Sequence, residues 1–407
     1  MEESVAGRTL LAQQGTIYPH IPKGVVMSSY RPNSNSLDRR HFLRSAGGSL
    51  AAGALLGVTG AQQAEAQEAK PESITHASAF RPMTDSEKVA RIASNSYPIR
   101  WIFKNHDNVG SKDTVTKMKA KYGEITMLDF PAFTKKTFPG VTKMDMWSSL
   151  FGDMDDASQY EKMTIMGYDN KPRVVTEFDP ATPSAKKWLE KMANVQAKEG
   201  VYCHHISNNA PRDICDLDDS KRKAGVAVAK KWLDGAAIIG AKSMRINSGG
   251  PRIAPWPQPN ETSYPKNPEL ERYLDQCILS FKEMAEHGAK VGVKVTLENH
   301  WGLTANPINI RIIVEEVNNV YCEASPDFCN WEHKYLLYHA LNDLAPYAHT
   351  TVHAKFWDRF GEPDVQRGVR IMLNNNYTGV FALEYEDGPW DGIEGAKYLY
   401  DQVKAAL

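Results

Sequence analysis

The chain has 407 residues, with 48 basic and 49 acidic side chains and a pI near 6.9. A chain of this length can bury a large core, and its hydrophobic content of 42% is that of a globular protein. The even charge balance lacks the basic surplus that binding to a phosphate backbone requires, so we expect no nucleic-acid partner.

The N-terminal residues have the pattern of an export signal. Ser36–Leu43 reads SLDRRHFL, an arginine pair with Phe-Leu shortly after it, as in twin-arginine signals. The Gly/Ala-rich apolar stretch Ala46–Ala61 follows, and Ala66 closes a small-x-small cleavage site. This stretch is too short to remain as a membrane anchor. We therefore expect the twin-arginine machinery to export the protein to the periplasm, with residues 1–66 as extension and signal. Met27 offers an alternative start.

The five cysteines do not indicate a disulfide framework. They form no Cys-x-x-Cys pair and their number is odd, despite the exported destination. We expect most of them to be buried as small hydrophobic residues.

After a polar linker at 67–82, strand-like and helix-like segments alternate, which is typical of an α/β fold with a parallel sheet. The first four expected strands are 93–97, 124–130, 201–206 and 242–247. Four more end at Glu298, Asp327, His353 and Glu384. The expected helices include 111–122, 184–199, 220–239, 268–290 and 393–407. Eight strand–helix units predict one (β/α)8 barrel over residues 83–407.

Two connections are too long for plain turns. Residues 131–183 follow the second expected strand and 248–267 follow the fourth, whereas such loops usually have roughly 2–6 residues. Loops that follow strands lie on the catalytic face of a (β/α)8 barrel. We expect these two to cover or wall a pocket. A surface excursion with a small core of its own is the alternative.

Four side chains with metal-binding chemistry recur at nearly one interval in the second half of the chain. Glu298, Asp327, His353 and Glu384 are separated by 29, 26 and 31 residues (327−298, 353−327, 384−353). A barrel unit takes about 30 residues, and strand ends meet at the barrel mouth. An isolated acidic residue at a strand end is usually a helix N-cap, but four at one period favour convergence on a single point. Two Glu, one Asp and one His there suit a divalent metal ion.

The sequences around these residues resemble the xylose-isomerase-like TIM-barrel superfamily, often labelled sugar phosphate isomerase/epimerase. The resemblance covers essentially the whole mature chain. The segments that carry it are 297–302 (LENHWG), 326–330 (PDFCN), 353–355 (HAK) and 383–386 (LEYE).

The resemblance implies that Glu298, Asp327, His353 and Glu384 bind the metal, and that Glu298 and Glu384 flank the substrate and exchange its protons. Where some relatives have a second His three residues after the Asp, this chain has Asn330. That residue removes a ligand of the trinuclear-zinc endonuclease branch. We therefore expect one divalent ion, which the sequence leaves open among Mn, Mg, Co and Zn.

Isomerising or epimerising a sugar requires removal of a C–H proton next to a carbonyl, which carboxylates can transfer while a divalent cation stabilises the charge that develops. Lys355 keeps the strand parity of His353 and is a candidate catalytic electrophile or anion binder. Because adjacent residues in a strand point to opposite faces, at most one residue of the pair at 204–205 enters the pocket, and we select His205. The other candidate substrate contacts are Arg245, Asn247 and His300.

These residues favour a metal-dependent isomerase or epimerase acting on an unphosphorylated sugar or glycoside. A lyase or dehydratase would use the same site for β-elimination from a keto-sugar. An endonuclease-like phosphodiesterase is disfavoured by the charge balance and by Asn330, and a non-catalytic sugar-binding protein would not need both glutamates. The sugar and the oligomeric state stay open.

Overall fold

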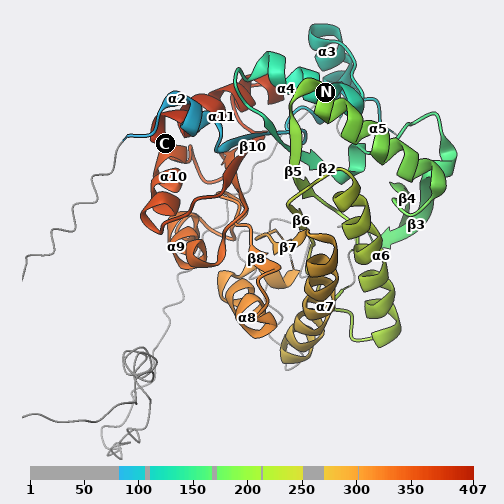
Figure 1. Cartoon of the computed structure of the whole chain (residues 1–407). Coiled ribbons are helices and arrows are strands. Elements are labelled where there is room, and N and C mark those ends of the chain that lie inside the picture. The colour runs from blue at the N-terminus through green and yellow to red at the C-terminus, as the bar shows by residue number, and fades with distance from the viewer. Residues whose placement is uncertain (1–81, 106–110, 167–171, 212–213, 251–269, 301) are drawn as a thin grey trace, which may run out of the picture. The chain divides into compact units, whose positions relative to one another are not determined.

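A computed structural model describes residues 82–105, 111–166, 172–211, 214–250, 270–300 and 302–407 (Figure 1). The predicted export signal, and the predicted linker except for its last residue, lie outside these residues. Within the described part of the chain, no helix has the length and apolar character needed to cross a membrane.

Eight parallel strands form one sheet in the order β8-β7-β6-β5-β2-β1-β10-β9. The chain just beyond β8 pairs with β9, because the Phe328 N–H donates to the His353 carbonyl at 3.1 Å and the His353 N–H donates to the Pro326 carbonyl at 3.1 Å. This pairing joins the two ends of the sheet and confirms the predicted (β/α)8 barrel. The strands are β1 (Ile92–Asn95), β2 (Lys143–Trp147), β5 (Tyr202–Ser207), β6 (Ser243–Arg245), β7 (Lys294–Leu297), β8 (Cys322–Ala324), β9 (Thr351–Trp357) and β10 (Val380–Asp387).

Helices surround the strands on the outside of the barrel (Figure 1). Their ends follow local rules: the Thr182 side chain accepts the Ala185 N–H at the start of α5, and Gly200 ends that helix in the left-handed conformation (φ 70°). The helices are α2 (Asp85–Val89), α3 (Lys112–Tyr122), α4 (Phe130–Thr137), α5 (Pro183–Glu199), α6 (Asp219–Ile238), α7 (Leu270–Val291), α8 (Pro307–Val317), α9 (Leu336–Leu344), α10 (Val365–Asn374) and α11 (Gly392–Ala406).

The prediction of the second strand at 124–130 is wrong. Only Ile125 makes a β-bridge there, and the 3-10 helix η2 (Met127–Asp129) leads directly into α4. The Asp129 carboxylate accepts the N–H of Thr126 at 2.8 Å, and Pro131 stands in the first turn of α4. An acidic residue three positions after a Thr, followed by Pro, starts a helix rather than continuing a strand. The second barrel strand is β2, which pairs with β1 and β5.

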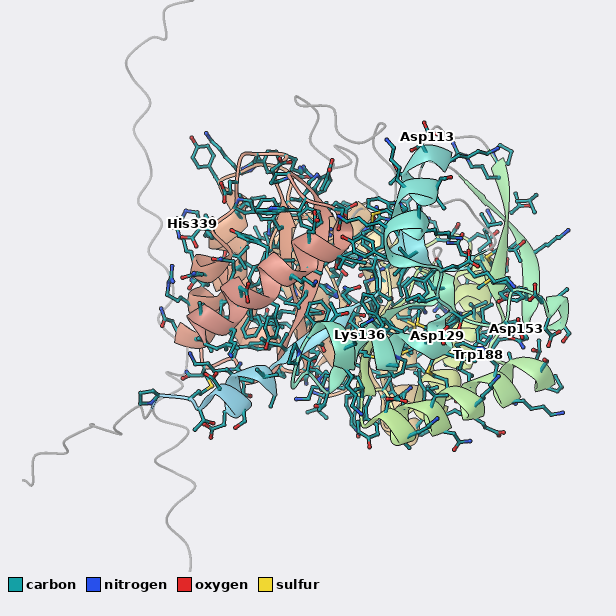
Figure 2. All side chains as sticks on the ribbon, turned by 90° about the horizontal axis from the view of Figure 1, so that it is seen from above. Asp113, Asp129, Lys136, Asp153, Trp188 and His339 are labelled. Carbon is teal, nitrogen blue, oxygen red and sulfur yellow. The ribbon has the colours of Figure 1, made fainter. Side chains whose placement is uncertain are left out.

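A long connection does follow the second strand, but it begins after β2. It carries an antiparallel hairpin of β3 (Tyr160–Met166) and β4 (Pro172–Phe178). The Phe178 ring packs against Trp188 of α5 and Trp232 of α6, with centroids 5.5 and 5.8 Å apart, and Trp188 lies on the hairpin side of the molecule in Figure 2. The hairpin therefore packs onto the outer helices of the barrel, and Phe178 extends the main hydrophobic core instead of forming a separate one. The second long connection runs from the end of β6 to α7, and most of it lies outside the described residues.

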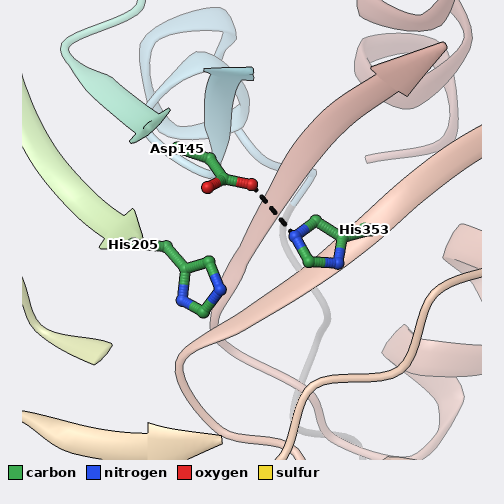
Figure 3. Close-up of side chains that lie close together, drawn as sticks. All are labelled: Asp145, His205 and His353. Carbon is green, nitrogen blue, oxygen red and sulfur yellow. Dashed lines mark hydrogen bonds and ion pairs between the residues drawn. The ribbon is translucent and has the colours of Figure 1, made fainter. Parts of the chain in front are cut away.

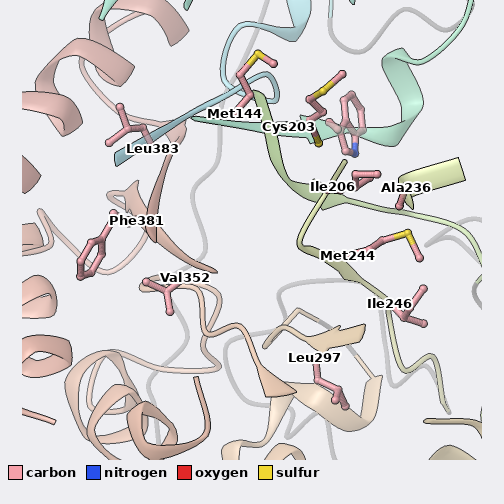
Figure 4. Close-up of a cluster of buried hydrophobic side chains, with 14 of the residues drawn as sticks. Met144, Cys203, Ile206, Ala236, Met244, Ile246, Leu297, Val352, Phe381 and Leu383 are labelled. Atoms are coloured by element: carbon pink, nitrogen blue, oxygen red, sulfur yellow. The ribbon is translucent and has the colours of Figure 1, made fainter. Parts of the chain in front are cut away.

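Strand residues alternate between an apolar face toward the helices and a polar face toward the barrel interior. The apolar side chains of several strands form the buried cluster in Figure 4. All five cysteines are buried with free thiols, as predicted. On β9, for example, Thr351, His353 and Lys355 alternate with Val352, Ala354 and Phe356, and all six are buried.

Candidate functional site

The polar interior brings three of the four predicted metal ligands into one group, and the fourth, Glu384, lies beside it with Oε2 3.9 Å from Nδ1 of His353. One oxygen of Glu298, one oxygen of Asp327 and one ring nitrogen of His353 lie within 4.8 Å of one another. Each residue is at most 2% exposed. His353 and Glu384 do not end their strands as predicted, because β9 continues to Trp357 and β10 to Asp387. The convergence of these two side chains comes from their shared inward parity.

Glu298 follows β7 and is held from three sides. Its Oε2 is 2.6 Å from Nη1 of Arg245 and 3.3 Å from Nδ1 of His353, and its Oε1 accepts the side-chain amide of Asn330 at 3.0 Å. Burial alone would raise the pKa of Glu298, but the positive charges of Arg245 and His353 outweigh it and hold this pKa well below its ordinary value. Glu298 is therefore an ionised carboxylate, ready to act as a ligand.

Asp327 has one satisfied and one unsatisfied oxygen. Its Oδ1 accepts the N–H groups of Cys329 at 2.6 Å and Asn330 at 2.8 Å. Its Oδ2 is buried without a hydrogen-bond partner and lies 3.6 Å from Nζ of Lys355. Burial raises the pKa of Asp327 to about 7, although the Lys355 charge opposes the shift. A buried carboxylate oxygen without a hydrogen-bond donor is suited to bind a cation.

His353 faces the cluster with one nitrogen and turns the other away from it. Its Nε2 lies 2.9 Å from Oδ2 of Asp145. Figure 3 marks this contact with a dashed line. Its Nδ1 makes no hydrogen bond, although Oε2 of Glu298 is 3.3 Å away and Oε2 of Glu384 is 3.9 Å away. Burial lowers the pKa of His353, but the Glu298, Glu384 and Asp145 carboxylates outweigh it and raise this pKa well above its ordinary value.

Glu384 and Lys355 form a second arrangement beside the first. The Lys355 Nζ is 3.0 Å from Oε1 of Glu384, 2.9 Å from Oε2 of Glu386 and 2.9 Å from Oδ1 of Asn330. Burial would lower the pKa of Lys355, but the Asp327, Glu384 and Glu386 carboxylates raise it well above its ordinary value, so this lysine is charged. Glu384 is thus oriented by a lysine, whereas Glu298 is oriented by an arginine.

The cluster carries more negative than positive charge. Arg245 and Lys355 face five carboxylates, and this excess of negative charge is reduced when His353 or Asp327 is protonated and by the charge of Arg100, which acts on Glu386. Uncompensated charge inside a protein is costly. Oδ2 of Asp327 and Nδ1 of His353 are both buried without a hydrogen-bond partner, and a bound cation would both satisfy these atoms and offset the negative charge. These residues fit a divalent cation, which takes oxygen and imidazole donors. The five carboxylates are Asp145, Glu298, Asp327, Glu384 and Glu386.

The predicted substrate contacts differ in whether their polar atoms are already engaged within the protein. Arg245 is occupied, because it binds Glu298 and donates from Nη2 to Oδ1 of Asn209 at 2.9 Å. Asn247 is buried with its Oδ1 lacking a partner, which leaves an acceptor for a bound hydroxyl. Burial lowers the pKa of His300 to about 3, so that ring is neutral.

His205 enters the interior because of a β-bulge. Met144 pairs with Cys203 but Asp145 pairs with His205, so His204 is the extra residue and His205 shares the face of Asp145. The His205 Nδ1 lies 2.8 Å from the Ser243 hydroxyl, and its buried Nε2 has no hydrogen-bond partner. Burial lowers the pKa of His205 to about 3. The ring is therefore neutral and can donate to or accept from a ligand.

Sequence reasoning missed Asp145, which is fully buried and bonded to His353. The signal was present: KMDMW places Asp145 between two methionines at the centre of a strand-like run. Asn330 was predicted only as a lost ligand, whereas it bridges Glu298 and Lys355.

Comparison with known proteins is consistent with this fold. The family model described as xylose isomerase-like TIM barrel matches residues 163–402. No curated protein matches the chain. A xylose isomerase-like TIM barrel protein from Mycobacterium smegmatis in complex with magnesium has a TM-score of 0.50 and 17% identity, with 80% of this chain and 100% of that chain covered. An L-ribulose 3-epimerase has a TM-score of 0.50 and 13% identity, with 78% and 95% covered. Because the family model spans more than half of the sequence, the chain belongs to the xylose isomerase-like TIM-barrel family.

Proposed function

We propose that the protein is a metal-dependent sugar isomerase or epimerase, which moves a proton at a carbon next to a carbonyl of an unphosphorylated sugar or glycoside. One observation carries this proposal. Two buried glutamates, one directly after β7 and one in β10, approach the same nitrogen, Nδ1 of His353, at 3.3 Å for Glu298 and 3.9 Å for Glu384. The L-ribulose 3-epimerase and the magnesium-bound relative, which share the fold, support this choice of reaction and cofactor.

Glu298, Asp327 and His353 would hold the ion, with Glu384 as the fourth predicted ligand. When bound, a divalent cation supplies positive charge that stabilises the enediolate formed as the proton leaves. Oε1 of Glu384 is engaged by Lys355, so we assign Glu384 first to proton transfer.

We assign removal of the substrate proton to Glu384. The Arg245 guanidinium 2.6 Å from Glu298 stabilises the ionised form of Glu298 and makes it a weak proton acceptor. The Lys355 ammonium is shared among Glu384, Glu386 and Asn330, so it orients Glu384 without serving it alone. Glu384 would remove the proton, and isomerisation needs only that it return the proton to the neighbouring carbon. Epimerisation would require a protonated Glu298 on the opposite face. Glu384 would gain the proton removed from one face, Glu298 would give up a proton to the other face, and exchange with solvent would restore both residues.

Lys355 would act as the electrophile. Its ammonium is buried and its side-chain contacts in the cluster are with carboxylates and an amide oxygen, so it can donate to a substrate oxygen that gains charge. Asn247 and His205 offer buried polar atoms without partners, which suit sugar hydroxyls. Export to the periplasm, proposed from residues outside the described ones, favours glycosides over phosphorylated metabolites as substrates.

The experiment is hydrogen exchange on candidate substrates. Ketoses and oxidised glycosides are incubated with Mn²⁺-loaded protein in heavy water and followed by ¹H NMR. We expect deuterium at the carbon next to the carbonyl, and its loss in Glu384→Gln. Release of an aglycone or of water would instead identify a β-eliminating lyase. Full exchange in both Glu298→Gln and Glu384→Gln would overturn the assigned roles.

A further inference from the structure

We infer that Asp145 is the positioning residue of this centre: it holds His353 in the one orientation and tautomer that turns the lone pair of Nδ1 toward Glu298 and Asp327. The inference rests on the metal centre of the proposed function, and it assigns a role to a residue on a strand that contributes no proposed ligand. The juxtaposition behind it spans four strands, β1, β2, β5 and β9.

Every neighbour of the Asp145 carboxylate is a donor. Its Oδ1 accepts the N–H of Ser207 at 3.1 Å. Its Oδ2 accepts the Ser207 hydroxyl at 3.0 Å, the side-chain amide of Asn95 at 2.9 Å and Nε2 of His353 at 2.9 Å. A carboxylate can only accept, so the ring proton of a neutral His353 stays on Nε2. Nδ1 is then left with a lone pair on the side of the metal ligands.

The backbone fixes this arrangement. Asn95 and Asp145 are paired across β1 and β2, and the bulge at His204 sets the register between β2 and β5. All four members of the network are at most 3% exposed. Hydrogen-bonded side chains on rigid strands hold a ligand more precisely than side chains on loops do.

A second metal ion at the same place is the competing interpretation. One donor atom each from Asp145, His205 and His353 lie within 4.8 Å of one another, and Figure 3 shows the three side chains together. However, the Asp145 oxygens already accept four hydrogen bonds, and Nε2 of His353 makes one of them. Only Nε2 of His205 remains without a partner. A site with one available donor would not hold an ion, so this group positions the ligand and does not bind a metal itself.

The substitution Asp145→Asn has a defined consequence. If the new amide nitrogen takes the place of Oδ1, it faces the Ser207 N–H, and if it takes the place of Oδ2, it faces the Asn95 amide. Either way a donor meets a donor. In the second orientation the amide also donates to Nε2 of His353, which moves the ring proton to Nδ1 and blocks the metal side. Loss of such a supporting partner typically weakens metal binding by about 10–100-fold.

The test uses two readouts on the full protein. Long-range ¹H–¹⁵N spectra of histidine-labelled protein, metal-free at an alkaline pH where the ring is neutral, report the tautomer of His353. Its signal is assigned by comparison with His353→Gln. Zn²⁺ titration by calorimetry reports affinity and stoichiometry. We expect the Nε2–H tautomer and one ion per chain in the wild type, and in Asp145→Asn an altered His353 spectrum with a 10–100-fold loss of affinity.

Glu323→Gln is the matched control. Glu323 is also a buried strand carboxylate, but it pairs with Lys294 at 2.6 Å and makes no contact with His353. The control should leave the His353 spectrum and the Zn²⁺ affinity unchanged. An Nδ1–H tautomer in the wild type overturns the inference, whether or not Asp145→Asn folds. Unchanged Zn²⁺ affinity in folded Asp145→Asn also overturns the inference. So does binding of two Zn²⁺ ions to the wild type with loss of one of them in Asp145→Asn. None of these readouts requires sugar turnover, so a failure of the proposed reaction is distinguishable from a failure of the role inferred for Asp145.

Discussion

The variants Glu298→Gln and Glu384→Gln should differ in stability, metal affinity and rate of substrate deuterium exchange. In Glu298→Gln the Arg245 guanidinium loses the carboxylate 2.6 Å away while remaining 4% exposed. Breaking a buried pair by removing one partner costs about 3–5 kcal/mol. The substitution also removes one of the three residues whose donor atoms lie within 4.8 Å of one another. We therefore expect both a less stable protein and much weaker metal binding.

In Glu384→Gln the buried cation that loses a carboxylate, Lys355, still has others beside it. Lys355 keeps Glu386 at 2.9 Å and Asp327 at 3.6 Å, so its charge stays compensated and the stability cost is only about 1–3 kcal/mol. The metal ligands Glu298, Asp327 and His353 remain. Removing a general base costs about 10²–10⁴ in rate. We expect substrate deuterium exchange to fall by that factor while Zn²⁺ affinity changes much less.

Urea unfolding, Zn²⁺ calorimetry and deuterium exchange on the two variants separate these effects. Glu298→Asp and Glu384→Asp, which keep the charge, control for the loss of the carboxylate as opposed to its placement. If Glu384→Gln loses Zn²⁺ affinity as severely as Glu298→Gln does, Glu384 is a principal metal ligand and not chiefly a base.

Three further results are expected. Lys355→Met leaves Glu384, Glu386 and Asp327 without their shared cation, so metal-free protein should lose about 3–5 kcal/mol in urea unfolding, and added Zn²⁺ should restore part of it; no loss would show that Lys355 is not their counter-ion. Chelation of the wild type should lower thermal stability by about 2.7 kcal/mol relative to protein with metal at 100 times its Kd, and an unchanged melting temperature would contradict a folded-state metal site. Gly302 has φ +70° and a Cβ there would collide with the Gly249 carbonyl, so Gly302→Ala should cost at least about 1–2 kcal/mol in urea unfolding, and a neutral substitution would show that the two loops separate easily.

The parts of the structure that follow the periodic pattern could be predicted from the sequence. The places where the chain departs locally from that pattern could not. Glu298, Asp327, His353 and Glu384 recur at the length of one barrel unit, and that regularity located the interior cluster. The second strand was misplaced because the run at 124–130 is apolar enough for a strand, although its Thr126 and Asp129 form a helix start. That error hid Asp145.

Hydrogen-bond partners within the cluster were beyond sequence reasoning. Spacing brings Lys355 and Glu384 to one interior, but only the packed side chains show that they bond to each other. The direction of His205 was decided by a bulge of one residue, which alternation alone does not reveal. Periodicity therefore predicts which side chains lie together in the barrel interior. Their hydrogen-bond partners follow only from the packed structure.

Calorimetric titration of Zn²⁺ into metal-free protein counts the ions that the buried cluster of Glu298, Asp327 and His353 binds. We predict one ion per chain with tight binding, and a large loss of affinity in Asp327→Asn, because Oδ2 of Asp327 is buried without a hydrogen-bond partner. The absence of binding, three ions per chain, or full affinity in Asp327→Asn would contradict this prediction.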